Sequence, residues 1–302
     1  MTARREADDC GIAQAAAVVG DWWTLLVLRE VARGHHRFDR LADELGVSRK
    51  VLAERLRSLT ENHVLERRRY QDRPPRYDYL LTEQGRGLLP VLVSMQDWAD
   101  RWLLGDGTLT GGAPEQGAEA RRVRALVGEP VPEGLVLPGT DGLGHDPVSA
   151  GARATVLFAY PATGVPGAPA GPVPATPIPG SAGCTLENRQ FRAAWPQFEA
   201  AGIAVRGVST QTPLEQAAFA AAEALPFPLL SDAELRLTAA LRLPAFRAGQ
   251  DLRIKRLVLV VGPDRVVRHA LFPVADIPAA VTTSLELARS VAQSVAPAGT
   301  AG

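Results

Sequence analysis

Apolar and polar positions follow two different rhythms along the chain, and the change falls near residue 105. Residues 12–104 are dense in charge and in helical periodicity, whereas short β-rich runs alternate with helical ones further on. The runs with strand character are 155–160, 203–209, 256–261 and 265–272, and those with helical character are 185–200 and 213–224. This order predicts a mixed sheet flanked by helices, in a second domain that follows a mainly helical one.

Two short helices and a hairpin are predicted inside the first domain. Residues 38–45 form one helix, Gly46 ends it, and Ser48 is placed to cap a second helix over 49–62. The stretch 64–82 then has two strand-like arms around a Pro-Pro turn, which predicts a β-hairpin wing. Together these parts predict a winged helix-turn-helix, an α+β fold.

Charge changes this picture locally. The net charge of the 302-residue chain is zero, so any affinity for nucleic acid must come from a patch. Between residues 49 and 76 the chain has nine Lys/Arg against four acids. A solvated charged face explains such a run, but the order of helix, turn, helix and basic hairpin favours a DNA interface. The candidate DNA-binding residues are Ser48, Arg49, Lys50, Arg55, Arg67, Arg68, Arg73 and Arg76.

Composition limits the other classes of function. No stretch approaches the roughly 18 apolar residues that span a bilayer, and the first ten residues lack an apolar signal region, so we expect a cytoplasmic protein without a membrane partner. Two cysteines and five scattered histidines give no zinc-ligand spacing, so no metal or other cofactor is predicted. The predicted parts are a domain over 1–104, a flexible linker over 105–121, a domain over 122–292 and a disordered tail over 293–302.

The last helix of the first domain carries an apolar stripe. Its members are Leu88, Leu92, Met95, Ala99 and Trp102, with Val91 and Trp98 alongside. A domain of this size can hardly bury the whole stripe alone, which favours a homodimer, while packing inside the domain is the alternative.

The stretch from about residue 8 to 104 contains a characteristic set of residues, which are Cys10, Gly20, Trp23 to Leu26, Leu28 to Glu30, Arg37, Phe38, Leu41, Leu45, Gly46, Ser48, Leu52, Arg55, Leu56, Leu59, Leu81, Thr82 and Gly85. In these residues the stretch resembles the HxlR family of winged-helix transcription regulators. The resemblance implies a homodimer formed by terminal helices on a double-stranded, roughly palindromic DNA operator. It also implies that Cys10 is either a redox-sensing residue or a buried structural thiol.

The second cysteine, Cys184, lies between a Pro/Gly loop and a helical stretch. Unpaired N–H groups and the helix dipole at a helix N-terminus favour thiolate, which predicts an acidic thiol. A thiolate can attack peroxide and become a sulfenic acid. A small apolar side chain in a core is the alternative for a lone cysteine.

Residues 127–290 resemble the peroxiredoxins, in particular the PrxQ-like or bacterioferritin-comigratory branch of the AhpC/TSA redoxins. Pro177, Ser181 and Cys184 fit P-x-x-x-[T/S]-x-x-C, and the stretches VGEPVP and PFPLLSD and Arg256 add to the match. The resemblance implies an α/β thioredoxin-like fold. It also implies that Cys184 is the peroxidatic thiol and that Ser181 hydrogen-bonds peroxide. Pro177 would act as a shield and a loop brace, and Arg256 would stabilise the thiolate and the developing oxyanion.

One position departs from this branch, because Arg189 stands where many members have a resolving cysteine. A small thiol, a thioredoxin-like protein or Cys10 must therefore reduce an oxidised Cys184. The leading hypothesis is a redox-responsive DNA-binding regulator. The alternatives are a one-cysteine thiol-dependent peroxidase with an accessory DNA-binding domain, and a redoxin fold that has decayed to a scaffold.

Overall fold

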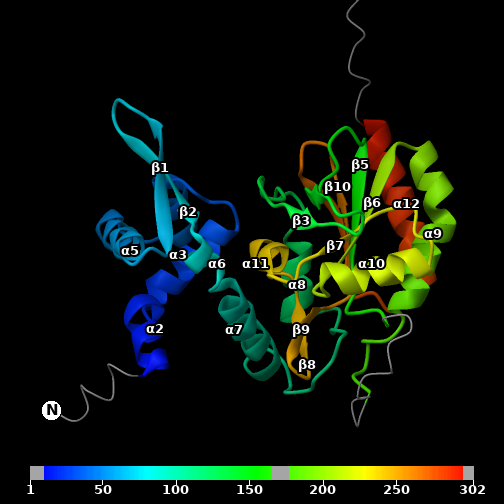
Figure 1. Ribbon diagram of the computed structural model, residues 1–302, viewed down its shortest axis with the longest axis horizontal. Coiled ribbons are helices and arrows are strands. Elements are labelled where there is room, and N and C mark those ends of the chain that lie inside the picture. The colour runs from blue at the N-terminus through cyan, green and yellow to red at the C-terminus, as the bar shows by residue number, and fades with distance from the viewer. Residues whose placement is uncertain (1–9, 165–176, 295–302) are drawn as a thin grey trace, which may run out of the picture. The chain divides into compact units, whose positions relative to one another are not determined.

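The computed structural model describes residues 10–164 and 177–294 (Figure 1). It divides the chain into two units, Met1–Leu92 and Val93–Gly302. This boundary falls inside helix α7 (Leu89–Trp102), twelve residues before the end of the predicted first domain. The last turns of α7 therefore belong to the second unit.

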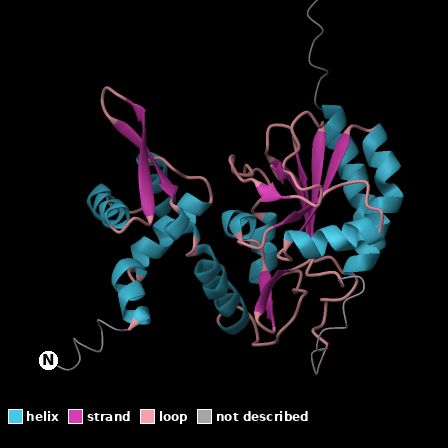
Figure 2. Cartoon of the chain, viewed as in Figure 1, coloured by secondary structure: helices cyan, strands magenta, loops and turns pink. Residues whose placement is uncertain are grey.

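The first unit has the predicted order of helices followed by a hairpin (Figure 2). Gly46 has the left-handed φ of 59° that ends α4, and the Ser48 Oγ accepts a hydrogen bond from the Val51 N–H at 3.3 Å to begin α5. Its elements are α2 (Gly11–Val19), α3 (Trp22–Ala32), α4 (Phe38–Leu45), α5 (Arg49–Glu61), β1 (Leu65–Gln71), β2 (Arg76–Leu81) and α6 (Glu83–Arg86). Strands β1 and β2 pair antiparallel. The predicted winged helix-turn-helix is confirmed.

A buried carboxylate ties the end of α3 to the turn that follows it. Glu30, on α3, is fully buried and pairs with Arg29 at 2.6 Å and with Arg33 at 2.7 Å, while its other neighbour is His35 at 2.9 Å. Burial alone would raise the pKa of Glu30, but the His35 hydrogen bond and the two guanidinium charges lower it to about 2.

The second unit is built on a five-stranded sheet of order β11-β10-β5-β6-β7. Strands β5, β6 and β7 are parallel, and β10 is antiparallel to both β5 and β11. The elements are α8 (Ala118–Arg124), β3 (Leu137–Pro138), β4 (Gly144–His145), β5 (Ala154–Ala159), α9 (Cys184–Ala200), β6 (Ile203–Ser209), α10 (Pro213–Ala222), β7 (Leu229–Ser231), α11 (Arg236–Leu241), β8 (Ala245–Ala248), β9 (Asp251–Ile254), β10 (Leu257–Val261), β11 (Val267–Leu271) and α12 (Ile277–Ser294). The predicted mixed sheet is confirmed.

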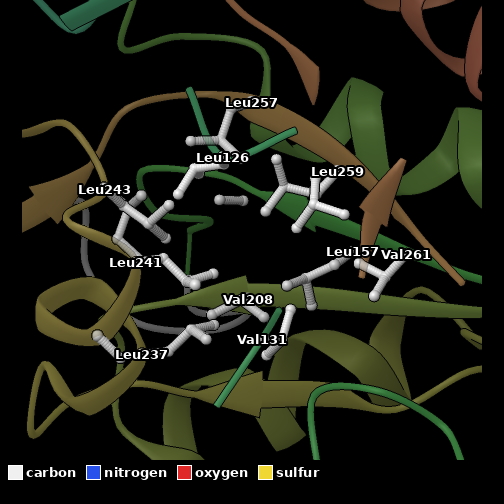
Figure 3. Packing of buried hydrophobic residues seen from close by; sticks show 14 of the residues in the cluster. Leu126, Val131, Leu157, Val208, Leu237, Leu241, Leu243, Leu257, Leu259 and Val261 are labelled. Atoms are coloured by element: carbon white, nitrogen blue, oxygen red, sulfur yellow. The ribbon is translucent and has the colours of Figure 1, made fainter. Parts of the chain in front are cut away.

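Each face of this sheet packs against its own core. On one face, side chains of β5 and β10 such as Leu157 and Leu259 pack with α8 and α11 (Figure 3). On the other face, Phe158 stacks on Phe191 of α9 with ring centroids 4.1 Å apart, and α12 completes the cover. Period-two alternation along buried strands thus sends successive residues to opposite cores.

The stretch predicted as a linker, 105–121, packs within the second unit instead. Helix α8 begins inside it, Glu119 and Ala120 are buried, and the Lys255 ammonium contacts both the Gly112 carbonyl oxygen at 2.9 Å and Glu119 at 2.8 Å. A Gly- and Pro-rich composition does not reveal such a long-range anchor. Of the predicted tail, residues 295–302 lie outside the described part, and α12 runs to Ser294.

Across the described residues no single helix has the length and apolarity needed to cross a membrane. One bent pair, Gly11–Val19 with Trp22–Ala32 at 75°, meets the same criteria by length and composition only.

Replacing Glu30 with glutamine tests the carboxylate network. Because Glu30→Gln leaves two guanidinium groups without their buried partner, we expect the first unit to lose about 3 kcal/mol of stability, measured by urea unfolding. The pKa of about 2 in the folded state lies below the ordinary value of 4.5, so this stabilisation is complete above pH 4.5 and is lost as pH falls toward 2. Glu61→Gln, at an exposed pair with Arg57, is the control and should change little; equal losses in both variants would contradict the assignment.

Candidate redox site and nucleic-acid interface

Cys184 is the first residue of α9, as predicted, and lies under the Pro/Gly loop that precedes it. The residue before it, Gly183, has a φ of 99°, which favours glycine. A Cβ at Gly183 would lie 2.7 Å from the Ile277 Cδ1, so the loop is held close to α12. Cys184 is only 4% exposed. Its thiol points at the Ser181 carbonyl oxygen, 3.6 Å from Sγ.

Arg256 reaches the cysteine from the sheet, just before β10 begins. Its guanidinium is buried, with Nη2 3.5 Å from the Cys184 Sγ and 2.8 Å from the Ala182 carbonyl oxygen. Nη1 pairs with Glu187, one turn into α9. The structure therefore brings Cys184 and Arg256 together, as the resemblance implied.

The predicted acidity of Cys184 is wrong for this conformation. Burial raises the pKa of the thiol, whereas the charge of Arg256 and the Ala162 N–H lower it, and the charge of Glu187 raises it again. The carbonyl oxygen of Ser181 also accepts from a thiol and would repel a thiolate. The helix N-terminus stabilises a thiolate at Cys184 by less than the removal of water around the sulfur destabilises it.

Ser181 and Pro177 occupy the predicted loop but do different things. The Ser181 hydroxyl donates to the Ile178 carbonyl oxygen at 2.7 Å, so it braces the loop in this conformation rather than facing the sulfur. Pro177 is exposed. Their implied roles toward peroxide stay predictions.

Sequence reasoning missed Glu187 and the Ala162 N–H. Glu187 is fully buried, and burial raises its pKa to about 8 although Arg256 opposes this. Its spacing of three residues from Cys184 places both on one face of α9, which is a signal that the sequence contains. No sequence signal marks Ala162, because its contribution is a backbone N–H.

Arg189, at the position of the missing resolving cysteine, fastens α9 to the end of α10. Its guanidinium forms two hydrogen bonds to the Glu223 carboxylate, at 2.7 and 2.8 Å. Arg192 bonds the Glu223 carbonyl oxygen. The second turn of α9 is therefore tied to its neighbour by two arginines.

At the first unit, the predicted DNA-binding residues separate into two groups. Arg49 and Lys50 are exposed at the start of α5, with Arg49 paired to Asp39 at 2.8 Å. Ser48 caps the helix. Arg55 is half-buried and turns back toward Asp21 at 3.4 Å, so we remove it from the candidate interface.

The wing supplies the other basic residues. Arg67, Arg68, Arg73 and Arg76 are all exposed on the hairpin. A groove of about 530 Å³ lies between the wing and the starts of α4 and α5, and its charged lining residues are Arg37, Arg40, Arg49, Arg76 and Asp39. Sequence reasoning did not include Arg37 and Arg40 among the candidate DNA-binding residues, since they precede the recognition helix. With four arginines against one acid, the charged lining of this groove is basic.

Cys10 precedes α2 and is exposed. The interpretation of Cys10 as a buried structural thiol is therefore wrong, while a redox role for it stays a prediction.

The apolar stripe on α7 divides into two parts. Leu88 and Leu92 pack against the core of the first unit. The exposed part, which we call the α7 stripe, consists of Val91, Met95, Trp98 and Trp102, which are 48–55% exposed. These four lie on one helix face at steps of four, three and four.

Among the described residues, Glu30, His35 and Glu44 place ligand atoms within 4.8 Å of one another. The Arg33 guanidinium already contacts both carboxylates, at 2.7 and 3.9 Å, and supplies the positive charge there. The negative charges of Glu30 and Glu44 are therefore compensated by a neighbouring protein side chain.

Solved structures similar to this chain include two redox proteins. Peroxidoxin BcpB from Mycobacterium tuberculosis is 26% identical, with a TM-score of 0.44, over 57% of this chain and 98% of that chain. Peroxiredoxin Q of Xanthomonas campestris is 24% identical, with a TM-score of 0.41, over 52% of this chain and 91% of that chain.

Curated relatives match the N-terminal part. An HTH-type transcriptional regulator of Mycobacterium tuberculosis is 42% identical over 92 residues, which is 30% of this chain and 58% of that protein. One of Synechocystis is 39% identical over 31% of this chain and 70% of that protein, and YodB of Bacillus subtilis is 35% identical over 29% and 80%. The chain thus spans little more than half the length of the Mycobacterium relative.

Two family models match different parts of the chain. The model described as HxlR-like helix-turn-helix matches residues 18–106, and the model described as AhpC/TSA family matches residues 176–270. Through its N-terminal domain the chain belongs to the HxlR-like helix-turn-helix family, and its C-terminal domain is a peroxiredoxin-like domain of the AhpC/TSA family.

Proposed function

We propose that this protein is a DNA-binding transcriptional regulator whose affinity for a double-stranded operator changes when peroxide oxidises Cys184. The observation that carries the proposal is the guanidinium of Arg256, 3.5 Å from the Cys184 sulfur, in the same chain as a winged helix with a basic groove. A buried arginine beside a cysteine at a helix start suits a nucleophilic sulfur better than a packing residue.

The oxidation step needs the thiolate form of Cys184. The sulfur attacks one oxygen of hydrogen peroxide, the S–O bond forms as the O–O bond breaks, and the leaving hydroxide takes up the thiol proton as water. Sulfur loses two electrons and becomes sulfenic acid, and peroxide gains them. Arg256 supports the negative charge in this step, whereas Glu187 competes with the thiolate for the same guanidinium.

The geometry favours a sensor over a turnover enzyme. Cys184 is almost fully buried and the chain has one other cysteine, Cys10. Because Arg189 and Arg192 fasten α9 to α10, the first turns of α9 resist the opening that a reducing thiol needs. An oxidised Cys184 should therefore persist until a small thiol or a thioredoxin-like protein reduces it.

The second candidate function is a one-cysteine thiol-dependent peroxidase that carries the DNA-binding domain as an accessory. The close pair of Cys184 and Arg256 favours it equally, because both functions begin with the same oxidation. The two functions differ in the fate of the sulfenic acid, which a peroxidase reduces quickly and a sensor retains.

A homodimer on a roughly palindromic operator is part of the proposal. The α7 stripe leaves two tryptophans, a methionine and a valine in contact with solvent, and a second copy of the chain would bury them. Sedimentation equilibrium checks this, and a monomer at micromolar concentration would contradict it.

The central prediction concerns DNA affinity before and after one equivalent of hydrogen peroxide. With an operator selected in vitro against the reduced protein, we expect oxidation to change the affinity of the wild type about tenfold or more and to leave Cys184→Ser unchanged, as measured by fluorescence anisotropy. Cys10→Ser controls for the other thiol. The same response in wild type and Cys184→Ser would refute the assignment of Cys184 as sensor.

Stopped-flow measurement of peroxide separates the two candidate functions. A sensor consumes one equivalent per chain and stops, even with excess dithiothreitol over seconds. Continuous consumption at a rate limited by the thiol would favour the peroxidase.

The shared guanidinium predicts opposite effects at two positions. Because the charge of Glu187 raises the pKa of Cys184, Glu187→Gln should lower that pKa, while Arg256→Met should raise it. In a Cys10→Ser background, alkylation of Cys184 by iodoacetamide at pH 9, where Glu187 with its pKa of about 8 is ionised, should become roughly three- to tenfold faster in Glu187→Gln and slower in Arg256→Met. Slower alkylation in both variants would show that the two residues only hold the fold.

The wing arginines predict the salt dependence of DNA binding. Replacing Arg73 and Arg76 with alanine should weaken binding to duplexes of any sequence and reduce the slope of log K against log salt by about 0.9 for each lost phosphate contact. Arg289→Ala, at a half-buried position on α12 of the second unit, is the control. An unchanged slope in the wing variant would place the DNA elsewhere.

A further inference from the structure

We propose that residues 107–112, which we call the coupling segment, transmit the oxidation state of Cys184 to helix α7. This inference rests on the proposed function, since it takes Cys184 as the residue whose state changes. It assigns a role to a stretch that comes soon after α7 and contacts both the cysteine loop and the entry to β10.

The coupling segment is bonded to the loop that carries the cysteine. The Gly111 N–H donates to the Pro179 carbonyl oxygen at 2.7 Å, and the Thr110 hydroxyl donates to the same oxygen at 3.1 Å. The two backbones touch here, because a Cβ on Gly180 would lie 2.6 Å from the Gly112 nitrogen. Two residues after Pro179, the Ser181 carbonyl oxygen accepts from the thiol.

A second contact comes from the other side of the redox site. Lys255 is the neighbour of Arg256 in sequence, and its ammonium donates to the Gly112 carbonyl oxygen at 2.9 Å. The same ammonium pairs with Glu119 of α8 at 2.8 Å. The coupling segment is therefore held by the residue that precedes Arg256 and by the loop that leads to Cys184.

The other end of the coupling segment is fixed to α7. The Arg101 Nε donates to the Gly107 carbonyl oxygen at 2.6 Å, and Asp100 forms a two-pronged ion pair with Arg122 of α8 at 2.6 and 2.8 Å. A cavity of about 460 Å³ is lined by Asp97, Asp100 and Arg101 of α7 and also by Pro179. The last turns of α7 and the cysteine loop therefore line the same cavity.

We expect oxidation of Cys184 to displace the loop before it rather than α9, because the loop is less tightly packed than the helix. The added oxygen must fit beside a sulfur that has Arg256 at 3.5 Å and the Ser181 carbonyl oxygen at 3.6 Å. A thiolate or sulfenate at this position has no S–H group to donate to that carbonyl oxygen, and its negative charge repels the oxygen. The helix side is packed core, whereas Pro177 and Pro179 are exposed, so the loop moves.

Movement of the loop alters the two hydrogen bonds to Pro179, and α7 receives the change through the coupling segment. Helix α7 carries the α7 stripe and begins in the DNA-binding unit, where Leu92 packs in the core. A shift of α7 would change the surface by which two copies meet, and with it the spacing of the recognition helices.

Hydrogen exchange of the full-length protein, followed by mass spectrometry, tests this inference. After one equivalent of hydrogen peroxide, we expect peptides within 93–112 to exchange at least threefold faster in the wild type and to stay unchanged in Cys184→Ser. Thr110→Val removes one bond to Pro179 and also the acceptor of the Gly112 N–H, with little change in shape. Its reduced form should therefore already show faster exchange in 107–112, and the effect of the bond to Pro179 is read at the amides other than Gly112. Thr282→Val, at an exposed threonine of α12, is the matched control and should show no change.

The readout separates this inference from the proposed function. Intact mass of the Cys10→Ser variant reports whether Cys184 gains an oxygen. A Cys184 that is oxidised while 93–112 keeps its exchange rates would overturn the coupling and leave the thiol chemistry standing. Should Cys184 resist peroxide, Cys184→Asp replaces oxidation with a fixed anion; faster exchange in 93–112 than in Cys184→Ser would support the coupling, and equal rates would overturn it.

Discussion

One buried guanidinium faces two buried acids, and the behaviour of the second unit depends on that imbalance. Arg256 contacts the Cys184 sulfur and pairs with Glu187, so only one of the two acids can be an anion with its charge compensated. Removal from water raises the pKa of both groups. The charge of Arg256 therefore compensates one anion at a time, and this geometry favours a neutral thiol at Cys184.

The fold places these three groups with backbone features of different origin. Cys184 and Glu187 share a face of α9 through helical spacing, and Arg256 stands where the chain enters the central strand β10. The same entry directs Lys255 to Gly112. Successive residues of an extended chain point in opposite directions, so one strand entry serves both the redox site and the coupling segment. The two residues before β10 therefore have different roles: Lys255 holds the coupling segment, and Arg256 completes the redox site.

The sequence predicts features that depend on residues close together along the chain better than features that depend on residues far apart along it. Helix α5, the wing and four of the five strands of the central sheet follow from local spacing, capping and turn residues, whereas the short β7 was not predicted. The prediction of Cys184 at a helix start is confirmed. Acidity of that thiol depends on burial by distant segments, and the local helix signal gave the wrong direction. The Gly- and Pro-rich run after α7 likewise has the composition of a free linker, because its anchors, Lys255 and Pro179, lie far along the chain. Arg55 illustrates the same limit, since its partner Asp21 precedes another helix.

The energy needed for regulation is small compared with the contacts available to supply it. A tenfold change in DNA affinity corresponds to about 1.4 kcal/mol, and a hydrogen bond in a folded protein contributes about 1 kcal/mol. The two bonds from Thr110 and Gly111 to Pro179 are together of this size. A redox change that weakens them can thus bias α7 without unfolding either unit. Because the oxidised sulfur and these bonds lie on the same short loop, the coupling requires a displacement of a few residues only.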